Sequence, residues 1–229
     1  MNFFEPPPPP ERPEPQFEIP ERKPWWGAPG NELGAVAPLR AVLARTDQVA
    51  VAIVGVTAYT TGFSMTLAVR SRSSLGGEGF DPMFGLSYGH GATQLGTELP
   101  PELLRFGVQF ADGSKATTLG SSVPWSLEEE PTSPILSPAG GSGGDFEWTQ
   151  EYWLWPLPPP GILTFAIEWP SKGIELSLLE VDAAPIIDAG GSSEVLWPDP
   201  GEGESSYSRD ATHLLFRASE EEPEDEGPS

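Results

Sequence analysis

Alternating apolar and polar positions dominate the middle of the chain and predict β-strands. Residues 63–70 place Phe, Met, Leu and Val on one face and Ser, Thr, Ala and Arg on the other, as in a half-buried strand. Residues 49–56 are apolar on both faces, which predicts a strand buried on both sides in the middle of a sheet. Residues 146–155 and 162–169 also alternate, and the proline-rich residues 156–161 break any pairing between them.

Turn residues connect further strands into antiparallel pairs. Asp112 and Gly113 end a predicted strand over residues 106–110, and residues 115–119 can return antiparallel to it. Residues 36–44 fit a helix as well as a strand. We favour a strand there, because the segment contains a proline, which is unfavourable inside a helix.

One short helix is expected near the C-terminal end of the core. Asp182 can cap it, residues 183–189 can form two turns, and Gly190 can end it. About seven strands with this helix predict an all-β fold, an antiparallel β-sandwich with an immunoglobulin-like layout. Residues 71–96 and 128–145 are glycine-rich or irregular, and we interpret them as flexible or functional insertions.

Composition divides the chain into three parts. Residues 1–24 hold nine prolines and five glutamates, which favours an extended, disordered arm. Residues 25–199 contain all eight tryptophans and are assigned to the β-sandwich domain. Residues 200–229 carry nine acidic residues against two basic ones, as in a mostly disordered acidic tail. Inside the tail, residues 211–217 form an apolar island that either packs on the core or orders on binding a partner.

Charge and residue usage exclude several classes of function. The chain has 34 acidic and 12 basic residues, so its formal net charge is −22. Phosphate groups would be repelled, which argues against nucleic acid and anionic membranes as partners. The absence of cysteine excludes disulfides, thiolate zinc sites and cysteine catalysis. The first residues lack signal-peptide features, and the longest apolar run of eight residues is too short to span a membrane, so we expect a soluble, cytoplasmic protein.

Several aromatic and glycine-containing segments resemble one protein family. The most specific is Tyr-Trp-Leu-Trp-Pro-Leu-Pro-Pro-Pro-Gly at residues 152–161, followed by Glu-Trp-Pro at 168–170. The other matching segments are residues 43–47, 61–63 and 104–113. Together they resemble an uncharacterised family of soluble proteins from high-GC Gram-positive bacteria, over roughly residues 20–199. The resemblance implies an all-β core, and it implies no activity, cofactor, ligand or site residue.

Residues able to act as nucleophile or general base are few and poorly placed. Residues 140–144 match the G-x-S-x-G pattern of a nucleophile elbow, but no helix is expected after the serine, so we interpret them as a flexible linker. His90 lies in the glycine-rich stretch and His213 in the tail, and these are the two histidines of the chain. We interpret both as exposed loop residues rather than as catalytic bases.

Carboxylates support a third, least favoured class of function, an acid/base enzyme of the glycosidase type. The candidates on or near strands are Asp81, Glu147, Glu151 and Glu168. An acidic chain produces such pairs by chance, so they carry little weight. Calcium binding by Glu202, Glu204 and Asp210 lacks a D-x-D-x-D-G loop, and zinc and nucleotide motifs are also absent. We therefore predict no metal site and no cofactor.

The tryptophans carry the most information about function. Trp153 and Trp155 share one face of a predicted strand, and Trp148 lies on the other face. Only one face can be the inner one, so the other set is either exposed or covered by another segment. An exposed aromatic row can bind sugars or a proline-rich peptide. Trp25 and Trp26 lie where the arm meets the core, and we predict that they anchor the arm by burial.

The favoured function is a non-catalytic protein-interaction or scaffold module, in which the arm, the tail or the aromatic face contacts a protein partner. The alternative is a small-ligand or carbohydrate-binding sandwich that uses exposed Trp153 and Trp155. The candidate binding residues are Trp25, Trp26, Trp153 and Trp155. No catalytic residue is predicted.

Overall fold

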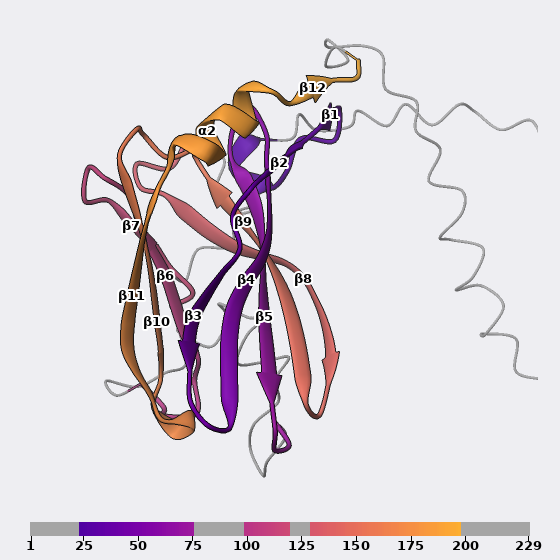
Figure 1. Cartoon of the computed structure of the whole chain (residues 1–229). Helices are drawn as coiled ribbons and strands as arrows, with labels where there is room; N and C mark the ends of the chain where they lie inside the picture. Colours follow the sequence, from indigo (N-terminus) through magenta and orange to yellow (C-terminus); the bar gives the residue numbers. More distant parts are fainter. Residues whose placement is uncertain (1–22, 76–98, 120–128, 198–229) are drawn as a thin grey trace, which may run out of the picture. The chain divides into compact units, whose positions relative to one another are not determined.

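The computed structural model describes residues 23–75, 99–119 and 129–197, which belong to one compact unit, Arg22–Pro198. This part of the chain is mostly β-structure in antiparallel sheets, with one short α-helix near its C-terminal end (Figure 1), which confirms the prediction at this level. The strands are β1 (Glu32–Leu33), β2 (Ala35–Ala37), β3 (Ala41–Arg45), β4 (Val49–Ala58), β5 (Phe63–Ser71), β6 (Arg105–Gln109), β7 (Lys115–Thr117), β8 (Ile135–Gly144), β9 (Glu147–Trp155), β10 (Ile162–Trp169), β11 (Ile174–Asp182) and β12 (Glu194–Val195). The helix is α2 (Ala184–Gly191), and η1 (Pro24–Trp26) and η4 (Pro170–Lys172) are 3-10 turns.

The larger sheet has six antiparallel strands. Its order is β2-β4-β5-β9-β8, and β3 also pairs with β4. β2 pairs with the last part of β4 and β3 with the first part. Pro38 lies between β2 and β3, and it interrupts the strand because proline has no backbone N–H to donate. The strand prediction for residues 36–44 is therefore confirmed, as two short strands.

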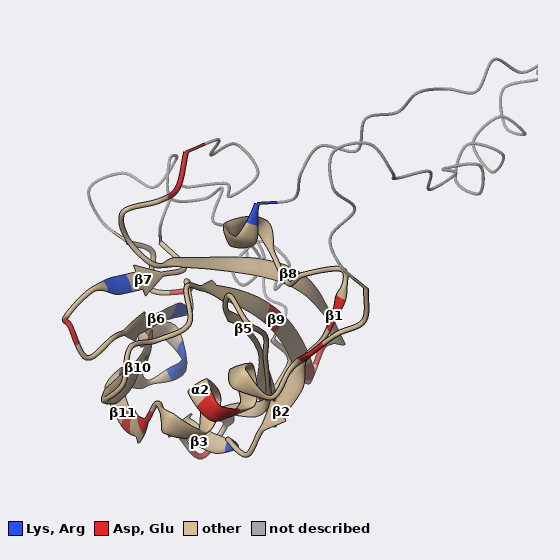
Figure 2. Cartoon of the chain, turned by 90° about the horizontal axis from the view of Figure 1, so that it is seen from above, with Lys and Arg blue, Asp and Glu red and all other residues tan. Residues whose placement is uncertain are grey.

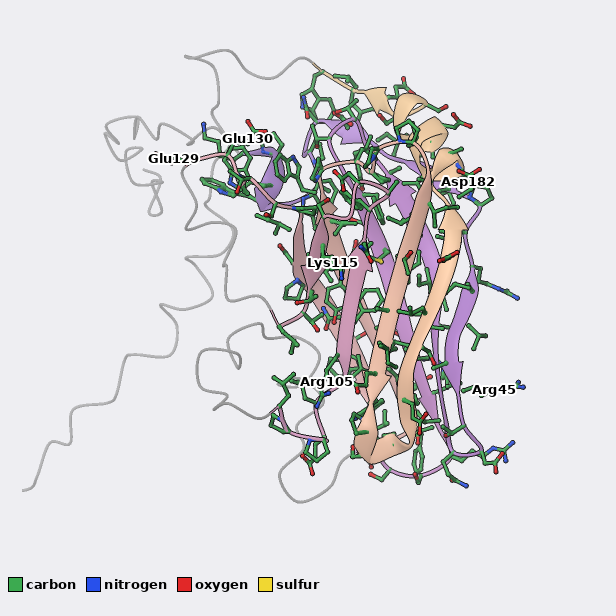
Figure 3. All side chains as sticks on the ribbon, turned by 90° about the vertical axis from the view of Figure 1, so that its left-hand side faces the viewer. Arg45, Arg105, Lys115, Glu129, Glu130 and Asp182 are labelled. Atoms are coloured by element: carbon green, nitrogen blue, oxygen red, sulfur yellow. The ribbon has the colours of Figure 1, made fainter. Side chains whose placement is uncertain are left out.

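The smaller sheet has four antiparallel strands in the order β11-β10-β6-β7. β10 has the bounds that the alternation predicts, and β6 and β7 form the hairpin predicted around Asp112 and Gly113. The Asp112 carboxylate accepts hydrogen bonds from the Ser114 hydroxyl and backbone N–H, at 2.6 and 2.9 Å, and these bonds lower the pKa of Asp112. Arg105 on β6 and Lys115 on β7 mark this sheet in Figure 3.

A two-stranded ribbon, which the sequence pattern did not indicate, joins the first and last described strands. β1 and β12 pair antiparallel, with Glu32 opposite Val195. The Asn31 carbonyl accepts the backbone N–H of Leu196 at 2.8 Å, and the Asn31 side chain donates to the Trp197 carbonyl at 3.2 Å. The ribbon therefore ties residue 31 to the C-terminal end of the described unit.

Side chains from the six-stranded and the four-stranded sheet form one buried hydrophobic cluster. Phe106 of β6 stacks on Phe165 of β10 with ring centroids 6.3 Å apart, and its ring lies 5.6 Å from that of Tyr152 on β9. β3 lies beside β11, and β7 beside β8 (Figure 2). The two sheets thus share a core. Burial in this core raises the pKa of Tyr152.

The predicted helix is confirmed with slightly shifted bounds. α2 is Ala184–Gly191, and the Asp182 carboxylate accepts the backbone N–H of Ala184 at 2.9 Å. The helix continues through Gly190, which was expected to terminate it, and ends at Gly191. Ile186 and Ala189 are buried in the shared core, so the helix covers one end of it (Figure 1).

The outer face of β4 is less buried than the apolar sequence indicates. The strand lies inside the sheet as predicted, but Val54 is 47% exposed. A β-bulge between Ile53 and Gly55 shifts the register at this point. The prediction of burial on both sides is therefore wrong for this part of β4.

The glycine-rich residues 140–144 belong to a strand, so their interpretation as a flexible linker is wrong. They form the second half of β8 and pair with β9, from Gly140 opposite Glu151 to Gly144 opposite Glu147. Close approach of β9 requires glycine here, because a Cβ atom on Gly143 would lie 2.3 Å from the carbonyl oxygen of Glu147. Glycines carry no hydrophobic pattern, which is why alternation did not reveal this strand.

Candidate functional site

The two faces of β9 carry separate hydrophobic clusters. Trp148, Tyr152 and Leu154 lie in the core that the two sheets share. Trp153 and Trp155 lie in a second cluster on the opposite face of the strand. The predicted separation of these two tryptophans from Trp148 is confirmed.

Trp153 and Trp155 are covered by another segment, which is one of the two arrangements that the sequence left open, so the exposed tryptophans that the alternative function requires are not found here. The two side chains are only 1% and 8% exposed, because η1 lies over this face of β9. Trp25 of η1 is buried, and its ring meets Trp155 edge-on with the centroids 5.7 Å apart. The predicted anchoring by burial is confirmed for Trp25, and Trp26 is partly buried against the same cluster. All four candidate residues thus come together, and their role in binding stays a prediction.

The sheet contributes a surface that we call the aromatic platform, which consists of Tyr59, Ile135, Trp153 and Trp155. Ile135 of β8 lies opposite Trp155, and the Tyr59 ring meets Trp153 edge-on at 5.7 Å. Gly62 leaves room for the Trp153 indole, since a Cβ atom there would lie 2.7 Å from its Cζ2 atom. The platform is therefore built from β8, β9 and the turn between β4 and β5.

One hydrogen bond joins the N-terminal segment to the platform. The Nε1–H group of Trp153 donates to the carbonyl oxygen of Pro24 at 3.2 Å. An indole N–H can only donate, and the Pro24 carbonyl oxygen supplies its acceptor here. The backbone N–H of Trp26 donates to the Lys23 carbonyl at 3.0 Å and closes η1 as a single turn. The acceptor is a main-chain atom, so the contact does not depend on a particular side chain.

Carboxylates act electrostatically on the platform. Glu32 accepts hydrogen bonds from the Thr60 backbone N–H, at 3.0 Å, and from the Thr60 hydroxyl. Glu151 is exposed on β9, two residues before the first tryptophan of the platform. Burial, and then the charges of Glu151 and Glu32, raise the pKa of Tyr59. Glu32 and Glu151 therefore place negative charge beside Tyr59 of the platform.

Two buried hydroxyl groups beside the platform have no hydrogen-bond partner among the described residues. Ser137 Oγ lies on β8 directly opposite Trp153, and Ser137 is 4% exposed. Thr61 Oγ1 belongs to the turn that precedes Gly62. Buried hydroxyls are usually paired, because an unpaired one loses its hydrogen bonds to water.

The strand carboxylates of the acid/base hypothesis do not come together. Glu168 on β10 pairs with Arg105 at 2.5 Å, and Glu147 on β9 pairs with Arg70 at 3.4 Å. Glu147 and Glu151 are four residues apart on one strand, which separates them by roughly 13 Å. Glycosidase carboxylates lie about 5 to 9.5 Å apart. In the described ranges, no three His, Asp or Glu side chains gather as metal ligands.

The remaining sequence candidates lie outside the described residues. They are Asp81, His90, Glu202, Glu204, Asp210, His213 and the apolar island at 211–217. The same holds for most of the glycine-rich stretch, for residues 1–22 of the arm and for the tail.

Comparison of the chain with protein-family models, with curated proteins and with solved structures found no match. Within the described ranges, no helix has the length and apolar character needed to cross a membrane.

Sequence reasoning missed three residues of this site. Ile135 and Ser137 fall in residues 128–145, which the sequence indicates as a flexible or functional insertion, and no sequence pattern points to Tyr59. Two adjacent apolar residues, Ile135 and Leu136, are followed by serine, proline, alanine and glycine residues, so no alternation marks this strand in the sequence. Nothing in the sequence indicates that this strand lies beside β9.

Proposed function

We propose that the chain is a non-catalytic protein-interaction module that contacts a protein partner through its N-terminal arm, residues 1–24. The observation that supports this proposal is the attachment of Pro24–Trp26 to the aromatic platform. Pro24–Trp26 lies on the outside of a sheet, away from the shared core. The C-terminal end of the arm, which we call its root and which consists of Pro24–Trp26, is therefore fixed at a defined place on the sheet.

Burial of Trp25 is strong enough to hold this root in place. A buried indole of about 200 Å² contributes up to about 5 kcal/mol, at about 25 cal/mol per Å². An exposed ion pair contributes only about 0 to 1 kcal/mol. Proline-rich segments suit recognition because their extended polyproline II form is adopted before binding, at little cost in entropy. An anchored, proline-rich arm is thus well suited to presenting a linear motif.

We further propose that the two larger sheets form a β-sandwich with an immunoglobulin-like layout. In support, the sheets share one buried core, and β3 of one sheet lies beside β11 of the other. A crystal structure tests this directly. Two sheets packed at about −30° would support the sandwich, whereas near-perpendicular sheets or continuous hydrogen bonding around a closed barrel would contradict it.

Affinity capture from native lysate tests the interaction function. The baits are the full chain, a chain lacking residues 1–22, and a chain lacking residues 200–229 as the matched control. We expect the full chain and the chain without its tail to recover the same protein in similar amounts. The chain without its arm should recover at least tenfold less of that protein. Equal recovery by the arm deletion would show that the arm is not the contact. Failure of every bait would remove the support for an interaction module.

A further inference from the structure

We propose that two copies of this chain associate through the outer surface of β3, β4 and β11, around a two-fold axis that runs parallel to β3 and β11. The centre of this surface, which we call the seam patch, consists of Val42, Val54, Leu176 and Leu178. The inference goes beyond the proposed function of the arm and uses none of the residues of the aromatic platform.

The seam patch lies where an edge of the six-stranded sheet meets an edge of the four-stranded sheet. Among the described residues, β3 is hydrogen-bonded only to β4, and β11 only to β10. β3 and β11 nevertheless lie beside each other (Figure 2). They run antiparallel, because Thr46, directly after β3, lies next to Gly173, directly before β11: a Cβ atom on Gly173 would lie 4.0 Å from Thr46 Cγ2.

The side chains of the seam patch are large, apolar and open to solvent. Val42, Leu176 and Leu178 are 60% to 64% exposed, and Val54 is 47% exposed. The strand register places an alanine opposite both Val42 and Leu178, so these two side chains project above their neighbours. A single exposed aliphatic side chain needs no explanation, but a group of them on neighbouring strands is typical of an interaction surface.

Charged side chains of opposite sign flank the patch on its two edge strands. Arg40 directly precedes β3 and Arg45 ends it, whereas Glu175 and Glu180 of β11 lie on either side of the two leucines. All four charged residues are exposed. Among the described residues, none of the four takes part in an ion pair. One flank of the patch is therefore basic and the other acidic, and both are open to a partner.

A two-fold axis parallel to the strands brings these opposite charges together. Such an axis places β3 of each copy over β11 of the other, at the same height along the strands. Because β3 ends at the height where β11 begins, Arg45 then faces Glu175 of the second copy, and Arg40 faces Glu180 of the second copy. The apolar side chains meet between these charges. An axis perpendicular to the strands would instead place arginine against arginine.

A second copy fits this surface better than a partner of one charge does. An isologous interface requires a patch that is complementary to itself, and the seam patch has both signs of charge around one apolar centre. A purely acidic or purely basic partner would meet like charge on one flank. The net charge of −22 repels a second copy at long range, but at 0.15 M salt the Debye length is about 8 Å. That repulsion is then largely screened, whereas charges in contact still attract.

The patch is small, so the association should be weak. Interfaces that bury less than about 1,200 Å² in total belong to the transient class. We expect a dissociation constant of about 10 to 100 µM for the dimer. A dimer carries two arms, and two linked motifs bind a partner with two sites more tightly than one motif does.

Analytical ultracentrifugation of the full chain between about 1 and 500 µM, at 0.15 M salt, tests the proposal. We expect the average mass to rise with concentration from that of one chain toward that of two. Leu178→Lys, at an exposed position that should leave folding intact, should raise the dissociation constant at least tenfold. Leu33→Lys is the matched control, because Leu33 is 60% exposed and lies on β1, and it should associate like the unsubstituted chain.

Charge reversal tests the orientation of the two copies. Arg45→Glu should weaken the dimer several-fold, and Arg45→Glu combined with Glu175→Arg should restore it. A chain that stays monomeric up to 500 µM would overturn the proposal. So would association that Leu178→Lys and Arg45→Glu leave unchanged, because the contact would then lie elsewhere. A chain lacking residues 1–22 should associate like the full chain, so failure of this inference and failure of the arm as a contact give different results.

Discussion

The indole N–H of Trp153 donates a hydrogen bond to the carbonyl oxygen of Pro24, 3.2 Å away, between residues 129 positions apart in the chain. This contact, with the edge-on meeting of Trp25 and Trp155, holds the N-terminal segment on the outer face of the larger sheet. Pro24–Trp26 is therefore held by a specific hydrogen bond and a ring contact as well as by apolar packing.

Removal of this hydrogen bond should lower the stability of the chain measurably. Trp153→Phe leaves the Pro24 carbonyl without its donor and leaves a void where the larger buried indole packed, so we expect a loss of at least about 1 kcal/mol in the free energy of unfolding. Urea denaturation followed by circular dichroism measures it. Trp197→Phe, at a half-exposed position, should stay within about 0.5 kcal/mol of the parent chain. Equal effects of the two substitutions would contradict the contact.

Two adjacent glycines of β8 test whether residues 140–144 form a strand. A Cβ atom on Gly143 would lie 2.3 Å from the Glu147 carbonyl oxygen, whereas one on Gly144 would meet nothing within 4 Å. Gly143→Ala should therefore destabilise the chain by about 2 kcal/mol, and Gly144→Ala by less than about 1 kcal/mol. Thermal unfolding compares the two variants. A flexible linker would give two small and similar effects.

The ion pair between Arg105 and Glu168 should matter more than the pair between Arg70 and Glu147. The side chains of the first pair are 19% and 33% exposed, and those of the second are 55% and 63% exposed. Glu168→Gln leaves a largely buried guanidinium without its charge partner, which should cost about 1 to 3 kcal/mol of unfolding free energy. Glu147→Gln should cost less than about 0.5 kcal/mol. Chemical denaturation measures the unfolding free energy of both variants. Equal losses of unfolding free energy would contradict this ranking.

Alkaline pH should destabilise the chain through Tyr152. Burial raises the pKa of Tyr152, whereas tyrosine in an unfolded chain ionises near pH 10. The stabilising contribution is therefore complete below about pH 10 and is lost as the pH rises above it, by up to about 1.4 kcal/mol per pH unit. Urea unfolding between pH 8 and pH 11.5 measures this slope. Tyr152→Phe should reduce it, and an unchanged slope would argue against a role for this side chain.

The hydrophobic pattern was sufficient where a strand has one clearly apolar face. β10 has the predicted bounds because Leu163, Phe165, Ile167 and Trp169 all face the core. The opposite orientation of Trp148 and Trp153 followed from the same alternation.

The pattern failed where pairing depends on backbone approach rather than on side-chain burial. The glycines of β8 are selected by contact with β9, which only the folded chain reveals. The burial of Trp25 was predictable from its position at the root of the arm. Its contact with Trp155 was not, because that contact depends on which strand η1 covers.

Hydrogen exchange of the tryptophan indole N–H groups, measured by NMR, tests the attachment of Pro24–Trp26 most directly. The Trp153 signal is assigned as the one that Trp153→Phe removes. The attachment predicts that the Trp153 indole N–H exchanges at least 100-fold more slowly than that of half-exposed Trp197, and that Trp25→Ala removes most of this protection. Equal exchange rates for Trp153 and Trp197 in the full chain would contradict the burial of the platform beneath Pro24–Trp26, on which the proposed function depends.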